Sequence, residues 1–221
     1  EAMRDALAGR KDVHVHAEPG DLFCGVLYNA VAEQVYDRVQ YSTILSPDAR
    51  KYLNAETLSD VYQAAAEGAL AASVAIDELQ PSVLEGRLTN TFCCWKNKTL
   101  VAVGGFDSRA AMPFDDRMAN YRRGYSPEKS EPVYYAQAGV EEMGPLAQLV
   151  DLYGEVLAPI LPRGPGIKAY EVPDPVTQPE LWERHVSKLG TKIPRQDFFL
   201  GQAGFDPSWL KRGVMRKYRQ S

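Results

Sequence analysis

The chain has 221 residues, of which 45% are hydrophobic and 24% are charged, so it has the composition of a soluble globular protein with room for one core. A formal net charge of −4 argues against general binding of nucleic acid, and three cysteines are too few for a disulfide framework. The cysteines favour a reducing compartment, and the chain contains no apolar run long enough for a membrane span.

The first third of the chain is predicted to contain one strand followed by helical segments. Residues 1–11 are expected to form an N-terminal arm, and residues 12–17 alternate apolar and polar side chains as a half-buried strand does. Residues 21–39 have the apolar spacing of a helix, and a short helical piece starts at Ser46. Residues 57–79 are predicted to be one long alanine-rich helix.

The clearest strand signal lies near the middle of the chain. Residues 90–95 and 99–106 flank a short polar turn, which predicts a β-hairpin. Neighbouring strand residues point to opposite faces, so Cys93 and Cys94 are expected to be buried thiols rather than a redox pair. Residues 107–131 are polar and are predicted to be a long loop insertion. The hairpin is expected to contribute core side chains, with Phe92 or Trp95 packing beside Leu100, Val101 or Val103.

Residues 132–172 are predicted to form a strand, a helix and a second strand. Residues 133–140 are rich in β-forming side chains, an apolar stripe marks a helix over residues 146–160, and residues 167–172 form the second strand. Such a unit normally makes two adjacent parallel strands. The helix N-terminus between them is a place where such units bind anions.

The end of the chain is predicted to contain a helix over residues 181–190, a strand over residues 197–200 and a helix that starts at Asp206. Residues 201–221 are expected to be a basic extension outside the core. The cations could contact a partner subunit, an anionic surface or nucleic acid, or they could form a solvated helix end. They are Lys211, Arg212, Arg216, Lys217 and Arg219.

This order of elements resembles that of the acetyltransferases of the GNAT superfamily. Residues 13–39 resemble the family's first strand and helix, and residues 92–106 resemble its second and third strands. Residues 132–172 resemble its fourth strand, acyl-CoA helix and fifth strand, and residues 181–190 its last helix. The resemblance implies one α/β domain over residues 12–200, with a mixed, mostly antiparallel sheet and helices on both faces.

The resemblance also implies where an acyl-CoA would bind. Family members carry an Arg/Gln-x-x-Gly-x-Gly/Ala loop, and the matching string here is EEMGPL at residues 141–146, in which only Gly144 fits. Glu141 stands in place of the Arg or Gln, and Pro145 removes an amide donor. The implied cofactor contacts are Val140, Met143 and Gly144.

Glu141 and Glu142 lie where a general base that deprotonates an amine would sit in a GNAT-like site. Their interaction with the helix dipole explains them equally well. The tyrosine that commonly protonates the departing thiolate in the family is replaced by Val186. Elsewhere in the chain, two histidines on one strand face and a nearby carboxylate could hold zinc, namely His14, His16 and Glu18. His185 has no evident catalytic neighbour in the sequence.

Two functions from different classes are therefore expected. The first is a non-enzymatic protein with a degenerate acetyltransferase fold, a structural or interaction subunit of a larger assembly that binds no cofactor. Its protein partners would contact the C-terminal extension and the loop at residues 107–131, in a reducing compartment or in a large particle. The alternative is an acetyl-CoA-dependent N-acetyltransferase with an atypical cofactor loop. A small metal-dependent hydrolase built on the two histidines is a third hypothesis.

Overall fold

The computed structural model describes residues 24–106, 140–168 and 170–219, which form a four-stranded sheet with the strand order β1-β3-β2-β4. β3 pairs antiparallel with β1 and β2, whereas β2 pairs parallel with β4. The predicted fold class, a mixed and mostly antiparallel sheet covered by helices, is confirmed. The strands are β1 Tyr41–Leu45, β2 Ala71–Val74, β3 Phe92–Lys96 and β4 Leu157–Ile160.

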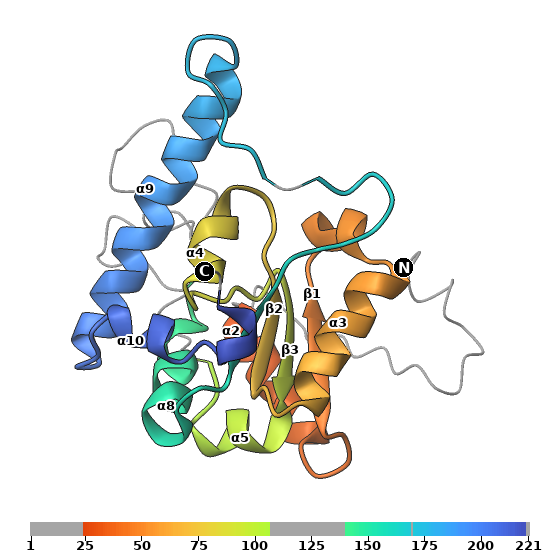
Figure 1. The fold of residues 1–221 in the computed structure, drawn as a ribbon. Coiled ribbons are helices and arrows are strands. Elements are labelled where there is room, and N and C mark those ends of the chain that lie inside the picture. Colours follow the sequence, from red (N-terminus) through yellow and green to blue (C-terminus); the bar gives the residue numbers. More distant parts are fainter. Residues whose placement is uncertain (1–23, 107–139, 169, 220–221) are drawn as a thin grey trace.

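Helices cover both faces of this sheet, and each face has its own apolar cluster (Figure 1). The α-helices are α2 Cys24–Val35, α3 Ala55–Ala66, α4 Gln80–Leu84, α5 Asn97–Ala102, α8 Met143–Tyr153, α9 Pro179–Gln202 and α10 Ser208–Arg212. The described residues also contain three short 3-10 helices, η1 Pro47–Tyr52, η2 Asp77–Leu79 and η6 Arg216–Tyr218. α3 packs on the face that carries Cys94, and α8 packs on the face that carries Cys93. Both thiols are buried on opposite faces of the sheet, as predicted.

The chain between α3 and β2 explains one error of the sequence analysis. α3 begins after Asn54, whose side chain accepts a hydrogen bond from the backbone N–H of Thr57. Shortly after the helix ends, Gly68 adopts a φ of +106°, a value that residues other than glycine rarely adopt. The chain then turns into β2. The prediction of one helix over residues 57–79 is therefore wrong in its second half. The alanines of β2 lie between two packed layers, where small side chains allow close contact.

The predicted hairpin is correct only in its first strand. α5 takes the place of the second strand, because β3 already has β1 and β2 on its two edges and offers no edge to a further partner. The short apolar run after the polar turn fits a helix or a strand, and as a helix it buries Leu100 and Val103. Phe92 and Trp95 are buried too, so these predicted core positions are confirmed.

Later elements differ from the prediction in a similar way. The helix predicted over residues 146–160 stops at Tyr153, Gly154 follows with a φ of +75°, and β4 forms from its last residues. The described residues of 167–172, which exclude 169, form no strand, and residues 197–200 belong to α9. The predicted segments at 1–11, 12–17 and 107–131 lie outside the described residues, as does the segment at 133–140 except for Val140.

The C-terminal segment is part of the core. Leu210 and Val214 are buried, and the backbone N–H of Met215 donates to the carbonyl of Leu157 at 2.9 Å, next to a bridge on the outer edge of β4. The expectation that the core ends near Leu200 is therefore wrong. Basic side chains of this segment pair with carboxylates of the body, namely Lys211 with Glu85, Lys217 with Glu67, and both Arg216 and Arg219 with Glu155. These ion pairs anchor the segment.

Candidate functional site

The acids that the sequence analysis selected lie inside the protein, at the amino end of α8. Glu141 and Glu142 are 5% and 1% exposed, and Glu142 is the N-cap residue without a capping hydrogen bond from its side chain. Lys192 of α9 places its Nζ 3.5 Å from Glu142 Oε1. Burial raises the pKa of Glu142 to about 7, although Lys192 acts in the opposite direction. The role of the two acids as general bases stays a prediction.

A second cation faces the same pair of acids. Arg195 of α9 is fully buried, and burial lowers its pKa to about 10 although the charge of Glu141 opposes this shift. The predicted cofactor contacts Val140 and Met143 are also fully buried, and Gly144 is half-buried. The sequence analysis thus located a real cluster of acids, but the structure encloses it between α8 and α9 with two basic side chains.

A more open group of polar side chains lies at the carboxyl ends of the two parallel strands. The chain that leaves β2 enters η2, and the chain that leaves β4 runs through residues 161–178, here called the strap and described except at residue 169. Figure 1 shows the strap crossing beyond the ends of the strands before it turns back to α9. Two adjoining pockets of about 340 and 260 Å³ lie beside it. Both are lined by Lys51, Asp77, Tyr170 and Glu171, and together they are called the groove.

Hydrogen bonds hold the strap at its start and at its middle. The carbonyl of Arg163 accepts hydrogen bonds from Asn54 at 2.8 Å and from Thr57 at 2.9 Å, and its guanidinium pairs with Asp60. The backbone N–H of Tyr170 donates to Gln80 Oε1 at 3.1 Å. The strap is therefore fixed to α3 and α4, which gives the groove a defined wall.

Asp77 occupies the centre of the groove in an uncommon backbone conformation. Among the residues that the structure describes, it is the one non-glycine residue with a positive φ, +46°. Its Oδ1 accepts hydrogen bonds from Lys51 Nζ at 2.8 Å and Tyr52 Oη at 2.7 Å. Burial acts to raise the pKa of Asp77, but these two hydrogen bonds and the charges of Lys51 and Lys188 together outweigh it, so the pKa is lowered. Asp77 is thus an ionised acid at neutral pH.

A histidine and a tyrosine form a second pair in the groove. His185 Nδ1 lies 2.8 Å from Tyr170 Oη, and their rings stack with centroids 5.7 Å apart. The ring of Trp182 contacts His185 as well. Burial raises the pKa of Tyr170, so its phenol keeps its proton at neutral pH. A hydrogen-bonded imidazole and phenol are groups that can donate and accept protons.

Glu78, beside Asp77, is buried and ties α9 to the end of β2. Lys188 Nζ lies 2.9 Å from Glu78 Oε1, and Arg184 Nε lies 3.4 Å from the same oxygen. Burial acts to raise the pKa of Glu78, but the hydrogen bond from Lys188 helps to bring it below its usual value. Arg184, His185 and Lys188 therefore all face the groove side of η2.

Sequence reasoning missed this groove. Asp77 lay within a predicted helix and Tyr170 within a predicted strand, so neither was expected near His185. One signal was present, because the spacing of α9 places its groove side chains three and four residues apart on one helix face. Leu181, Arg184 and His185 line the groove, and Lys188 on the same helix pairs with Glu78 beside it.

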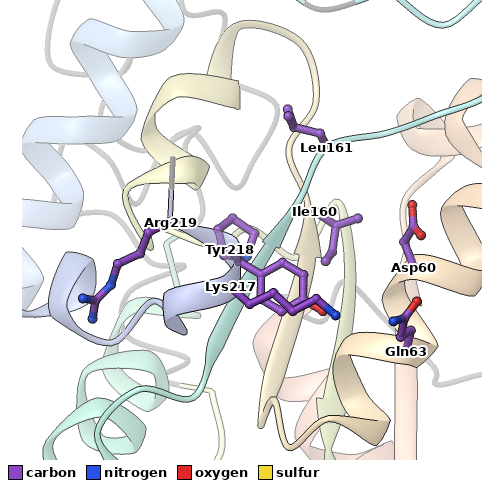
Figure 2. Close-up of a pocket in the computed structure, with 8 residues that line it drawn as sticks. Asp60, Gln63, Ile160, Leu161, Lys217, Tyr218 and Arg219 are labelled. Carbon is purple, nitrogen blue, oxygen red and sulfur yellow. The ribbon is translucent and has the colours of Figure 1, made fainter. Parts of the chain in front are cut away.

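A third pocket, of about 540 Å³, lies between α3 and the C-terminal segment (Figure 2). Its charged side chains already have partners, since Lys217 and Tyr218 bind Glu67, and Asp60 pairs with Arg163. These bonds, with the largest contribution from Lys217, lower the pKa of Glu67 to about 2. We therefore assign these residues to the anchoring of the C-terminal segment.

A metal site and a membrane span are two further kinds of functional feature. Within the described ranges, no group of three or more His, Cys, Asp or Glu side chains is arranged to hold a metal ion. The predicted ligands His14, His16 and Glu18 lie outside those ranges. No helix in the part of the chain that the structure describes is long and apolar enough to cross a membrane.

Comparison of the chain with models of known protein families, with curated protein sequences and with solved structures gave no match. The resemblance to the GNAT superfamily stays a prediction, and the function must be argued from the residues themselves.

Proposed function

We propose that the protein binds a small polar ligand in the groove. The observation that carries the proposal is the convergence of η1, η2, the strap and α9 on Asp77, at the carboxyl ends of two adjacent parallel strands. Open α/β sheets bind ligands outside the carboxyl ends of their strands. A non-glycine residue held at positive φ costs free energy, and such residues cluster at functional sites.

The groove also has groups for acid–base chemistry on that ligand. His185 and Tyr170 form a hydrogen-bonded pair at the wall of one pocket, and Asp77 supplies an ionised carboxylate. The two pockets, about 340 and 260 Å³, have the size of small-molecule sites rather than of surfaces for macromolecules. The reaction class that follows is proton transfer to or from a small bound molecule.

The direct test is a ligand screen read by NMR on isotope-labelled protein. A diverse panel of small polar metabolites should contain compounds that shift the amide signals of Asp77, Tyr170 and His185 together. Asp77→Asn should weaken the binding of such a compound, whereas Asp37→Asn, on the exposed turn after α2, should not. Compounds that shift only signals outside the groove, or no binding at all, would contradict the proposal.

The interaction subunit expected from the sequence is a second candidate, supported by the exposed apolar side chains in residues 172–186. Val172, Val176 and Leu181 are 56%, 84% and 52% exposed, which is unusual for three large apolar residues within ten positions. Acidic residues accompany them, so the matching partner would be a protein with an apolar face and a basic rim. These acids are Glu171, Asp174, Glu180 and Glu183.

Size-exclusion chromatography with light scattering, on protein isolated with whatever co-purifies, tests this candidate. This candidate is supported if a complex is found and the double substitution Val176→Asp with Leu181→Asp dissociates it. The matched control is Leu152→Asp with Tyr153→Asp at the exposed end of α8, which should leave the complex intact. A lone monomer at all concentrations would contradict it.

The acetyl-CoA alternative depends on the amino end of α8, where the burial of Glu141 and Glu142 supports the expectation of weak binding. A pyrophosphate there would meet two buried carboxyl groups and a proline without an N–H. Calorimetric titration with acetyl-CoA should show a dissociation constant in the millimolar range or weaker. Micromolar binding that Gly144→Trp abolishes would restore the acetyltransferase hypothesis.

A further inference from the structure

At the centre of the groove, the residues that line both pockets include two acids, Asp77 and Glu171, and one base, Lys51. Asp77 Oδ1 takes both hydrogen bonds of Lys51 and Tyr52, whereas its Oδ2 accepts none from the described residues. Glu171 lines both pockets, is exposed, and forms no ion pair with the residues that the structure describes. The ammonium of Lys51 is already engaged, so the centre offers one free carboxylate and one free carboxylate oxygen to a cationic ligand group.

A guanidinium also lines the smaller pocket. Arg184 is 69% exposed, and only its Nε approaches Glu78, at 3.4 Å. Lys188 contacts the same Glu78 oxygen at the shorter distance of 2.9 Å, so Glu78 does not depend on Arg184. The terminal nitrogens of Arg184 are therefore available for a carboxylate, which a guanidinium binds through two parallel hydrogen bonds.

Apolar side chains complete this pocket. Pro173 of the strap and Leu181 of α9 line it beside the charged side chains. Its volume of about 260 Å³ suits a compound of a few carbon atoms that carries one positive and one negative group. A ligand with one charge alone would leave either the acids or the guanidinium without a partner.

We propose that the smaller pocket of the groove binds a free α-amino acid, with its ammonium between Asp77 and Glu171 and its carboxylate on Arg184. This inference rests on the proposed function of the groove and names its ligand class. The ligand side chain packs against Leu181 and Pro173, which favours aliphatic over acidic amino acids. His185 and Tyr170 then line the same pocket as the ammonium group.

Titration calorimetry on the full chain tests the proposal with the twenty amino acids and with matched analogues of leucine. Isopentylamine lacks the carboxylate, and 4-methylpentanoate lacks the ammonium. We expect at least one aliphatic amino acid to bind, and each single-charge analogue to bind at least tenfold more weakly. Arg184→Gln should weaken the binding of the amino acid at least tenfold, while the binding of the amine should stay unchanged. Arg38→Gln, at an exposed position after α2, is the matched control.

The outcomes separate this inference from the proposed function. If no amino acid binds while other polar compounds shift the amide signals of the groove residues, the proposed ligand class is wrong and the groove remains a binding site. The ligand class is also wrong if the single-charge analogues bind as tightly as the amino acid, or if Arg184→Gln has no effect. If no compound of either panel reaches the groove, both proposals are wrong.

Discussion

The amino end of α8 and the groove use charged side chains in opposite ways. At α8, Glu142 and Arg195 are 1% and 0% exposed and face other charged groups inside the protein. In the groove, the side chains of Lys51 and Arg184 are 61% and 69% exposed, and each touches an acid that is mostly covered. In the groove, a ligand could replace the water around these charged side chains. At the amino end of α8, it would have to displace protein side chains. A motif locates residues along the chain, and burial decides what they can bind.

The largest expected effect tests this difference in burial with two arginines on the same helix. Arg195→Ala removes a cation from an enclosed cluster and leaves the buried carboxyl group of Glu141 without this opposite charge, which costs about 3–5 kcal/mol of unfolding free energy. Arg184→Ala removes an exposed cation and should cost about 1 kcal/mol or less. Urea unfolding monitored by circular dichroism measures both values. Equal losses would remove the distinction between the two regions.

The next effect concerns the pH dependence of two buried glutamates, which should have opposite signs. The pKa of Glu142 is raised to about 7 by burial, so its contribution to stability is complete below the usual glutamate pKa and is lost as the pH rises through 7. A shift of this size corresponds to about 3 kcal/mol between pH 4.5 and pH 8. The stability of the unmodified protein minus that of Glu142→Gln should fall over that range.

Glu78 provides the matched comparison. Burial acts to raise the pKa of Glu78, but the hydrogen bond from Lys188 and other favourable contacts together lower it. The contribution of Glu78 to stability is therefore present at neutral pH and is lost as the pH falls. The stability of the unmodified protein minus that of Glu78→Gln should therefore rise with pH below the usual glutamate pKa and stay level above it, whereas the Glu142 difference falls above that pKa. Two curves with the same slope would mean that the surroundings of the two acids have been assigned wrongly.

Composition and apolar patterning were sufficient for the class of the fold but not for its topology. The burial of Phe92, Trp95, Cys93 and Cys94 followed from alternation along one strand. The segment at residues 69–74 is predicted to be helix because alanine has a high helix propensity, whereas its place between two neighbouring strands decides its conformation. Such pairing is a long-range property that a local pattern does not contain.

The candidate sites show the same limit. The acids at the start of α8 were found because the sequence places them together, and their enclosure by α9 depends on residues about fifty positions later. The groove draws on η1, η2, the strap and α9, and no two of its central residues, Asp77, Tyr170 and His185, are close in sequence. The helical spacing of Arg184, His185 and Lys188 was the one local sign, and it indicates a shared face without saying what that face contacts.

The smallest expected effect on stability is at Asp77, where function and stability should separate. Asp77→Gly relieves a positive φ that costs about 1–2 kcal/mol for an ordinary residue, but it also removes hydrogen bonds from Lys51 and Tyr52 that are partly open to water. The two changes oppose each other, so the unfolding free energy should change by about 1 kcal/mol or less. Asp77→Asn, in which the new residue also tolerates a positive φ, should lose only the charge and weaken the hydrogen bonds.

Both variants should lose ligand binding in the groove, as measured by titration of a compound that binds the unmodified protein. A strongly destabilised Asp77→Gly protein would show that Asp77 acts mainly as a structural link between η1 and η2, and full retention of ligand binding would show that the ligand does not use this carboxylate.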